Sequence, residues 1–199
     1  MNFQNFRLLY LFSCFALCLI ILLPTFSFFI SFPKGQEFSE LWILGPTHMM
    51  EGYPLNVSSG GVYNVFLGIE NHMGSLQYYL VRIKLRNQSE PFPDSIHGIP
   101  SDLPAVFDYQ AFLSDGDTWE KEVTFSFEDV SLDGNVGKVS GFYIDGFFVD
   151  VDKVAVWNDD NSGFFYQLFF ELWVYDSGVS GFKFHNRSVG LWLNMSRQL

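Results

Sequence analysis

Two patterns of hydrophobic and polar residues divide this 199-residue chain. Residues Leu8 to Phe32 form a 25-residue run without a charged side chain, whereas apolar and polar residues alternate beyond residue 40. A helix rises about 1.5 Å per residue, so the run would span roughly 37 Å and could cross a hydrocarbon core of about 30 Å. The sequence therefore predicts a transmembrane helix over residues 8–32 that lies in the lipid bilayer, followed by a domain of β-strands.

A cleaved signal peptide is the alternative interpretation of the run, because Arg7 precedes it. Signal peptides have apolar regions of about 7 to 15 residues that end at a site of small residues. Here the apolar character continues to Pro33, and no Ala-x-Ala pattern occurs. Pro24 is compatible with a membrane helix, where neighbouring groups can satisfy the freed carbonyl. We therefore expect an uncleaved anchor.

Alternation of apolar and polar residues predicts eight strands after the anchor. In each strand one set of side chains faces a core and the other set faces outward. The second strand, for example, places Tyr79, Val81, Ile83 and Leu85 inward and its basic residues Arg82, Lys84 and Arg86 outward. The expected strands are 62–70, 76–86, 106–113, 118–127, 138–144, 147–151, 164–175 and 182–194.

Turn sequences separate these strands. Asn71–Ser75 predicts a hairpin-type turn between the first two strands, and Ser177-Gly178 joins the last two. Asp145-Gly146 suits a two-residue type I′ turn, because glycine adopts a positive φ without steric cost. Seven to nine short strands of this kind indicate an antiparallel β-sandwich of immunoglobulin-like type, although a jelly-roll variant fits the same pattern.

The predicted organisation has four parts and a mainly β fold. We expect a short cytoplasmic tail over residues 1–7, the transmembrane helix over 8–32, a linker over 33–40 and the β-sandwich over 41–199. Both cysteines, Cys14 and Cys18, lie in the anchor, so disulfides and thiolate metal sites cannot stabilise the β-domain.

Composition excludes two classes of protein. After Phe32 there are 22 acidic and 10 basic residues, a formal charge of −12, so the domain lacks the basic surface that binds nucleic acid. The chain also contains 24 Phe, 9 Tyr and 5 Trp, whose burial can support a packed core. This composition excludes a disordered stalk.

Four Asn-x-Ser acceptors indicate the orientation of the chain. They begin at Asn56, Asn87, Asn186 and Asn194, whereas chance predicts about 1.3 such matches at this composition. The charges beside the anchor set the direction only weakly, with Arg7 on one side and Lys34 on the other. The acceptors therefore favour a single-pass cell-membrane glycoprotein with its C-terminal domain outside.

Five segments in order resemble a known family. They are Phe38–Pro46, Glu51–Val57, Asn71–Gly74, Phe165–Trp173 and Phe184–Arg187. Together they are similar to the membrane-protein family of domain of unknown function 1616, which is uncharacterised and mainly archaeal. The similarity covers about Phe38 to Met195, and since longer relatives have several membrane helices, this chain resembles a short single-span member. The resemblance implies a membrane-anchored β-domain displayed outside the cell, and it provides no catalytic residues.

An acidic cluster is the candidate for a metal site. Asp150, Asp152, Asp159 and Asp160, with Asp145, Asn158 and Asn161 nearby, provide the oxygen ligands that Ca²⁺ prefers. The spacing of an EF-hand is absent, and solvated turns have the same composition. These four aspartates are therefore weak calcium candidates, and we expect no resident cofactor or other metal.

Catalytic motifs are absent from the sequence. The histidines, His48, His72, His97 and His185, show no metal-binding spacing and are interpreted as turn and sheet residues. No G-x-S-x-G motif occurs, and Gly60-Gly61 precedes a strand rather than a helix. Asp115 and Asp117 could form the carboxylate pair of a glycoside hydrolase, but a turn explains them as well. We therefore expect a protein that is not an enzyme.

A second set of aromatic residues lies on the outward positions of the last two strands. Phe165, Phe169, Trp173 and Trp192 could be buried by other parts of the protein, contact a protein, or stack against sugars. The sequence thus predicts a non-catalytic interaction domain whose partner is an envelope protein or a glycan. The alternatives are a carbohydrate-binding or calcium-binding module and, less favoured, a hydrolase.

Overall fold

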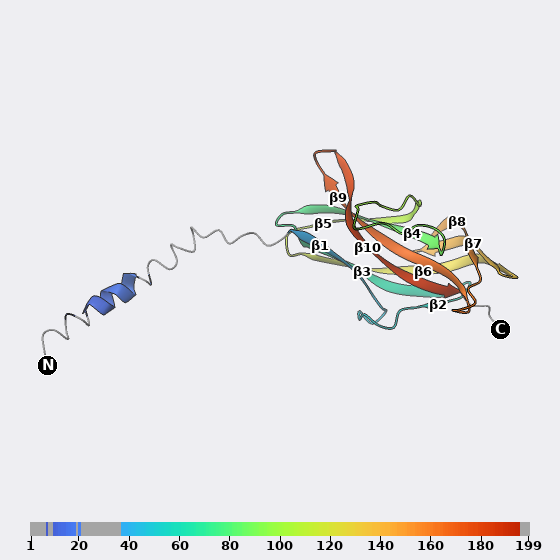
Figure 1. Ribbon diagram of the computed structural model, residues 1–199, viewed down its shortest axis with the longest axis horizontal. Helices are drawn as coiled ribbons and strands as arrows, with labels where there is room; N and C mark the ends of the chain where they lie inside the picture. Colours follow the sequence, from blue (N-terminus) through green and yellow to red (C-terminus); the bar gives the residue numbers. More distant parts are fainter. Residues whose placement is uncertain (1–6, 8–9, 19, 21–36, 196–199) are drawn as a thin grey trace. The chain divides into compact units, whose positions relative to one another are not determined.

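The computed structural model describes residues 7, 10–18, 20 and 37–195, which belong to two separate units. In the first unit, Met1–Glu37, the described residues before Glu37 are helical (Figure 1). The rest of the predicted tail, of the predicted transmembrane helix and of the linker up to residue 36 lies outside the described residues. Within the described ranges, the structure contains no helix of the length and apolar character needed to cross a membrane.

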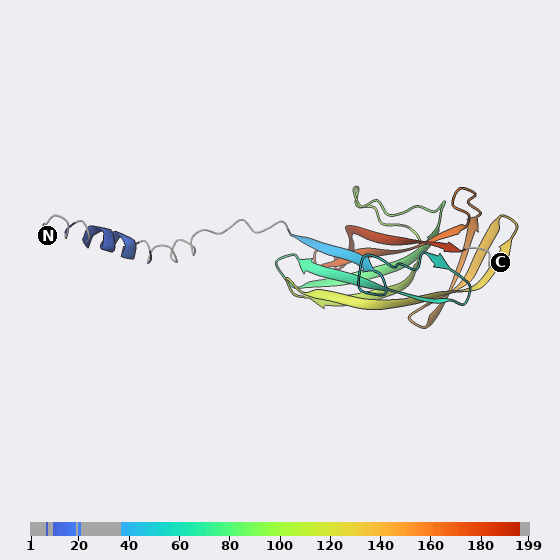
Figure 2. The same ribbon diagram turned by 90° about the horizontal axis from the view of Figure 1, so that it is seen from below.

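The second unit, Phe38–Leu199, consists of two five-stranded sheets that enclose one core (Figure 2). The first sheet has the order β1 (Phe38–Leu44), β3 (Val62–His72), β6 (Thr118–Asp133), β7 (Val136–Ile144) and β8 (Phe147–Val156). The second sheet has the order β2 (Asn56–Val57), β10 (Gly181–Met195), β9 (Phe164–Asp176), β4 (Gln77–Asn87) and β5 (Ala105–Leu113). Neighbouring strands are antiparallel except β2 and β10, which pair in parallel. The predicted mainly β, two-sheet architecture is confirmed.

All eight predicted strands are present, and β1 and β2 are additional. β1 begins at Phe38, inside the range assigned to the linker. Its inward side chains, Ser39, Leu41 and Ile43, alternate with neighbours that include the apolar Phe38 and Trp42, so the contrast between the two faces is weak. This mixture explains why alternation did not reveal the strand.

The Asn71–Ser75 segment is not a hairpin turn, contrary to the sequence prediction. The strands that it joins, β3 and β4, lie in different sheets, so the segment crosses from one sheet to the other. The Asn71 amide nitrogen donates to the carbonyl oxygens of Ser75 (2.9 Å) and Leu113 (2.8 Å), and its oxygen accepts from the Met73 N–H. Alternation shows that two segments are strands, but it does not show whether they pair with each other.

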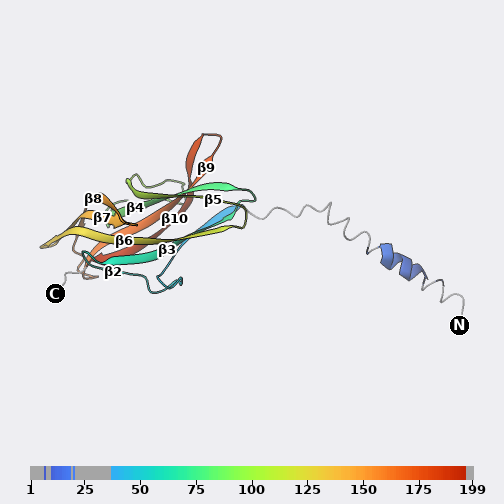
Figure 3. The same cartoon turned by 180° about the vertical axis from the view of Figure 1, so that it is seen from behind.

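The turn between β7 and β8 agrees with the prediction. Asp145 has φ 48° and Gly146 has φ 81°, the two positive values that a type I′ turn requires. The flanking residues Ile144 and Phe147 are paired across the hairpin. Two other hairpins extend from the body: the β9–β10 tip stands away from it (Figure 1), and the β6–β7 hairpin extends at the end opposite the start of β1 (Figure 3).

The core lies between the inward faces of the two sheets. The inward positions predicted for β4 are all buried, as are most of those predicted for the other long strands. The largest fully buried side chains are Tyr79, Tyr166, Phe125, Phe127, Phe142, Phe164, Phe169 and Phe170. Phe169 and the nearby Lys84 are outward residues of the second sheet, and their burial identifies a covered area on its outer face.

Candidate functional site

Part of the outer face of the second sheet is covered by the segment 88–104, which connects β4 to β5. Lys84 on β4 and Glu171 on β9 form an ion pair of 2.9 Å on this face, with side chains 3% and 0% exposed. Lys84 Nζ donates to the Ser101 carbonyl (2.5 Å), and the Ser101 N–H donates to Glu171 Oε1 (2.7 Å). Lys84 points outward as predicted, but the connecting segment covers it, so its side chain is removed from solvent.

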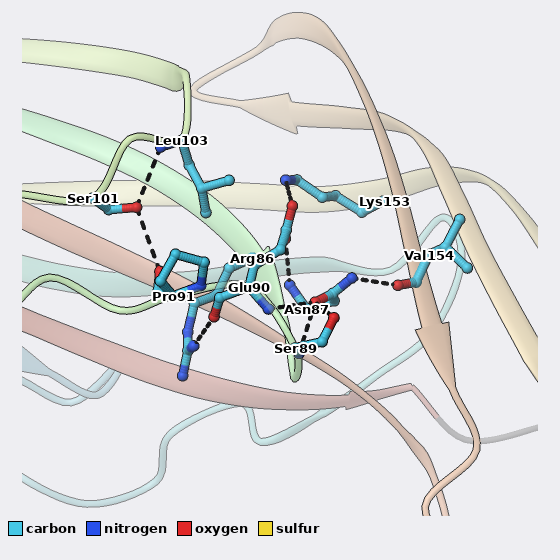
Figure 4. Close-up of polar contacts among 9 residues, drawn as sticks. All are labelled: Arg86, Asn87, Ser89, Glu90, Pro91, Ser101, Leu103, Lys153 and Val154. Carbon is cyan, nitrogen blue, oxygen red and sulfur yellow. Dashed lines mark hydrogen bonds and ion pairs between the residues drawn. The ribbon is translucent and has the colours of Figure 1, made fainter.

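Glu90 fixes this segment to both sheets (Figure 4). Its carboxylate accepts the Asn87 N–H (2.8 Å) and forms an ion pair of 2.6 Å with Lys153 on β8 of the first sheet. The Glu90 carbonyl accepts a hydrogen bond from Arg86, and the Asn87 side-chain amide donates to the Val154 carbonyl (2.6 Å). The segment therefore holds the end of β4 against β8.

Aromatic residues complete the covered area. Phe92 of the connecting segment packs on Phe169, with ring centroids 5.4 Å apart, and Phe169 is fully buried. The Arg86 guanidinium lies over the rings of Phe92 (5.3 Å) and Trp192 (4.8 Å). For Phe169, burial by the protein itself is thus the correct one of the three interpretations of the outward aromatic residues.

The remaining part of this face carries aromatic rings that are half-buried or exposed, which we call the aromatic face. Its members come from four neighbouring strands: Tyr78, Phe112, Trp173, Tyr175, Phe182 and Phe184. Their proximity follows from the register, which pairs Tyr78 with Phe112 on β4 and β5. It also pairs Phe182 with Tyr175, and Phe184 with Trp173, on β10 and β9. Trp173 is therefore half-buried beside these rings, whereas Phe169 is fully buried.

The rings of the aromatic face contact one another. Tyr78 stacks on Phe112 with centroids 4.1 Å apart and planes 3° apart, and it also contacts Phe182 at 4.9 Å. Tyr175 and Phe182 are 5.6 Å apart in an edge-to-face arrangement. Phe112 is nevertheless 67% exposed, an unusually high value for a phenylalanine within a sheet. The arrangement offers flat apolar surfaces to a ligand.

Polar groups border these rings. Gln110 accepts a hydrogen bond from the Tyr78 hydroxyl (2.6 Å), which leaves its amide nitrogen available beside the rings. The Arg82 guanidinium lies 4.4 Å from the centre of the Trp173 ring, and Arg82 is paired in register with the exposed Asp108. Hydrogen-bond donors and acceptors thus lie at the edge of an apolar surface.

A buried polar network lies between the sheets, where β1 and β3 approach β4 and β10. The Ser39 hydroxyl contacts the Tyr79 hydroxyl (2.6 Å) and His185 Nε2 (3.0 Å), and Tyr79 donates to the Asn71 side-chain oxygen (3.0 Å). A bulge in β10 between Phe184 and Arg187 places His185 there. Burial is the main cause that lowers the pKa of His185, and the charge of Arg187 adds to it. Burial also raises the pKa of the Tyr79 hydroxyl.

This network satisfies buried polar groups and does not resemble a working catalytic dyad. Ser39 and His185 are in contact, but Ser39 is 1% exposed, so a substrate carbonyl has no access to its hydroxyl. His185 is a sheet residue with an ordinary hydrogen bond, as the sequence suggested.

The calcium candidates are not brought together. Asp152 forms an ion pair with Lys138 (2.8 Å), Asp150 is paired with Gly141 in the β7–β8 ladder, and Asp159 and Asp160 lie in the turns that follow β8. Among the described residues, no three ligands from this set lie within coordinating distance of one another. Asp145 is also occupied: it accepts from Tyr109 (2.5 Å) and from the N–H of Thr124 (2.9 Å).

The carboxylates suggested for a hydrolase have roles in turns. Asp115 accepts from the Gly74 N–H (2.7 Å), and Asp117 accepts from the Ser114 N–H (3.1 Å). These contacts fix the crossing from β5 to β6, which agrees with the interpretation of this segment as a turn.

The four glycosylation acceptors differ in their surroundings. Asn56 and Asn186 are exposed, whereas the side-chain amide of Asn87 donates to a backbone carbonyl. The Asn194 amide donates to the Asn56 side-chain oxygen (3.3 Å), across the parallel β2–β10 pair. A glycan on Asn194 would be attached to the nitrogen that makes this contact.

Comparison with known proteins identifies a family but no function. A family described as a domain of unknown function, DUF1616, matches residues 33–136. No curated protein matches the sequence.

Similar solved structures include a β-glucosidase from Listeria innocua in complex with gluconolactone, at 11% identity and TM-score 0.39, over 84% of this chain and 17% of that one. The same enzyme with glucose has 13% identity, TM-score 0.37 and the same coverage. The PapD-like domain 7 of human CEP192 has 10% identity and TM-score 0.31, over 85% and 92% of the two chains. The chain thus spans about a sixth of the glucosidase, and likenesses at these scores carry no argument about function.

Proposed function

The chain belongs to the DUF1616 family, and for this member we propose a non-catalytic role as a binding protein of the cell surface. Residues 8–32 anchor it in the cell membrane as a single span, and its β-sandwich lies outside the cell. The aromatic face binds the partner. The exposed stack of Tyr78 and Phe112 is the observation that carries this proposal.

Two parts of the same outer sheet face differ in their exposure to solvent, and this difference supports the aromatic face as a binding surface. The protein covers Phe169 with its own segment 88–104, whereas Phe112 and Tyr175 remain 67% and 41% exposed. Large contiguous apolar surfaces are costly in water, and they are common at binding sites. A partner that stacks on these rings would remove them from water. The burial of this apolar surface would contribute favourably to the free energy of binding.

The strand order supports an immunoglobulin-like form of the sandwich. The first sheet contains the order β1-β3-β6 and the second the order β10-β9-β4-β5. Immunoglobulin-like domains divide their strands between two sheets in a similar way, with chain crossings between the sheets. Such domains commonly bind through one face or one end of the sandwich.

The length and uncharged character of residues 8–32 support the anchor, and the four acceptor sites support an external domain. A short amino-terminal tail then lies in the cytoplasm. The burial of the Ser39–His185 contact supports a role without nucleophilic catalysis.

A carbohydrate is the ligand class that the border of the aromatic face favours. Sugars present C–H groups on their ring faces and hydroxyls at their edges, so they need flat apolar surfaces beside hydrogen-bonding groups. Tyr78 and Phe112 provide the first, and Gln110, Arg82 and Asp108 provide the second. An envelope glycan is therefore the preferred partner, and an envelope protein is the second candidate.

Glycan-array binding of the detergent-solubilised full chain tests this role. We expect F112A and Y175A to weaken binding about tenfold or more, since stacking and the burial of ring area are lost. F148A is the matched control, because Phe148 is 48% exposed on β8 of the other sheet. If F112A and Y175A bound glycans as well as the unchanged chain, the aromatic face would not be the binding site. If no glycan bound, the carbohydrate assignment would be wrong.

A further inference from the structure

Two acidic residues and one histidine converge on the outer face of the first sheet. The β1–β3 register places Glu40 directly opposite Glu70, and Phe38 opposite His72. Side chains two residues apart on a strand share a face, so Glu70 and His72 lie on the same side of β3. One ligand atom from each of Glu40, Glu70 and His72 lies within 4.8 Å of the others.

The charge of this cluster is not balanced by a basic side chain of the described part of the chain. Like charges that face each other across paired strands destabilise a sheet. Across residues 37–195, no lysine or arginine forms an ion pair with Glu40 or Glu70. The charge of −12 after Phe32 adds to the repulsion. A bound cation would turn this repulsion into attraction.

His72 is positioned to act as a ligand. Its Nε2 atom lies 3.0 Å from Glu70 Oε1, and its ring stacks on Phe38 with centroids 4.6 Å apart. The stack restricts the orientation of the imidazole, while about a third of the side chain remains open to solvent. An ion therefore has access to a nitrogen that already points at a carboxylate.

We propose that Glu40, Glu70 and His72 form a binding site for a divalent first-row transition metal ion, for which Zn²⁺ is the best representative. An imidazole with two carboxylates suits such an ion better than it suits Ca²⁺, which takes oxygen ligands alone. Ligands of a tetrahedral ion with bonds of about 2.1 Å lie roughly 3.4 Å apart, so small rotations of the glutamate side chains would close the site. Water completes the coordination.

The proposed metal site is separate from the aromatic face. The three ligands lie on the outer face of the first sheet, whereas the aromatic face lies on the outer face of the second. A failure of glycan binding would therefore leave the metal proposal intact, and the reverse also holds.

Isothermal titration calorimetry of the metal-free full chain in detergent, with Zn²⁺ alone as the titrant, tests the site. We expect one saturable site per chain, and we expect H72A and E40Q each to weaken it at least tenfold. The matched control is H97A, since His97 is an exposed histidine that also contacts a carboxylate, that of Asp94 (2.6 Å). The same affinity in H72A and in the unchanged chain, or no saturable binding at all, would overturn the proposal.

Thermal unfolding provides a second readout, which does not measure binding directly. Without metal, E40Q should melt at a higher temperature than the unchanged chain, because it removes one of two facing charges. With Zn²⁺ in excess, the unchanged chain should gain thermal stability while E40Q gains little, since an ion that binds only the folded state stabilises it. Equal gains in both proteins would contradict the assignment of Glu40 as a ligand.

Discussion

Lys84 and Glu171 form an ion pair of 2.9 Å on the outer face of a sheet, yet both side chains are removed from water by the segment 88–104. The Ser101 carbonyl accepts a hydrogen bond from Lys84, and the Ser101 N–H donates one to Glu171. Backbone groups of one residue therefore stabilise both buried charges. The position of the covering segment 88–104 therefore depends on its contacts with β4 and β9. The part of the face that it buries is distinct from the aromatic face.

Removal of the lysine should destabilise the domain strongly. K84M leaves Glu171 as an unpaired buried charge, and we expect the free energy of unfolding to fall by about 3–5 kcal/mol in urea denaturation. The double variant K84M/E171M should recover part of this loss, because no unpaired charge remains. K121M, at a pair whose lysine is 45% exposed, should have a much smaller effect. Equal losses in K84M and K121M would contradict the role given to burial.

The attachment of segment 88–104 should depend on Glu90. E90Q weakens the contact with Lys153, which holds the segment against the first sheet. We therefore expect faster amide hydrogen exchange across residues 88–104, with little change in the β3–β6 pair of the other sheet. Unchanged exchange in the segment would show that the packing of Phe92 on Phe169 is sufficient to hold it.

The turn between β7 and β8 should require glycine. At Gly146, φ is 81°, a value that side chains disfavour, so G146A should lower the free energy of unfolding by about 1 kcal/mol. No atom within 4 Å would contact the added methyl group, so the loss would come from the backbone conformation alone. G181A is a suitable control, because the φ of Gly181 is not in the positive range and its added methyl group has only an ordinary contact at 3.8 Å.

Stability should depend on pH through His185. Because the pKa of the half-buried His185 lies below its ordinary value of 6.5, the unfolded chain binds a proton there at a higher pH than the folded chain does. The stability that His185 contributes is therefore fully present above pH 6.5 and is lost as the pH decreases below that value. H185Q should reduce this fall, as measured by urea denaturation between pH 7 and pH 5. H97Q, at an exposed histidine, is the matched control, and equal pH profiles for H185Q and the unchanged chain would contradict the assignment.

The strands were predictable from the sequence because their inward faces form one dense core. Val81, Ile83 and Leu85 alternate with the basic residues Arg82, Lys84 and Arg86, and this period-two pattern depends only on local geometry. The pairing of strands was not predictable in the same way. Asn71 fixes a crossing between sheets through contacts with Leu113, a residue 42 positions away, and no local pattern encodes that distance.

The candidate sites show the same division. Alternation identified Trp173 as an outward aromatic residue, but whether such a residue is covered depends on segment 88–104, which has no periodic pattern. The sequence does not predict the cluster of Glu40, Glu70 and His72. Its alternation does not reveal β1, and the register of β1 with β3 is not encoded locally. Glu70 ends the predicted strand and His72 lies in the predicted turn, whereas β3 continues to His72 and places both residues on one face.

Site-specific photocrosslinking in intact cells tests whether the aromatic face binds a partner. A benzophenone side chain placed at position 112 of the full chain would react with C–H bonds of either a glycan or a protein, and the same group at position 148 is the control on the other sheet. We predict a crosslinked adduct at position 112 and little or none at 148. An adduct at 148 with none at 112 would show that the aromatic face is not the binding surface.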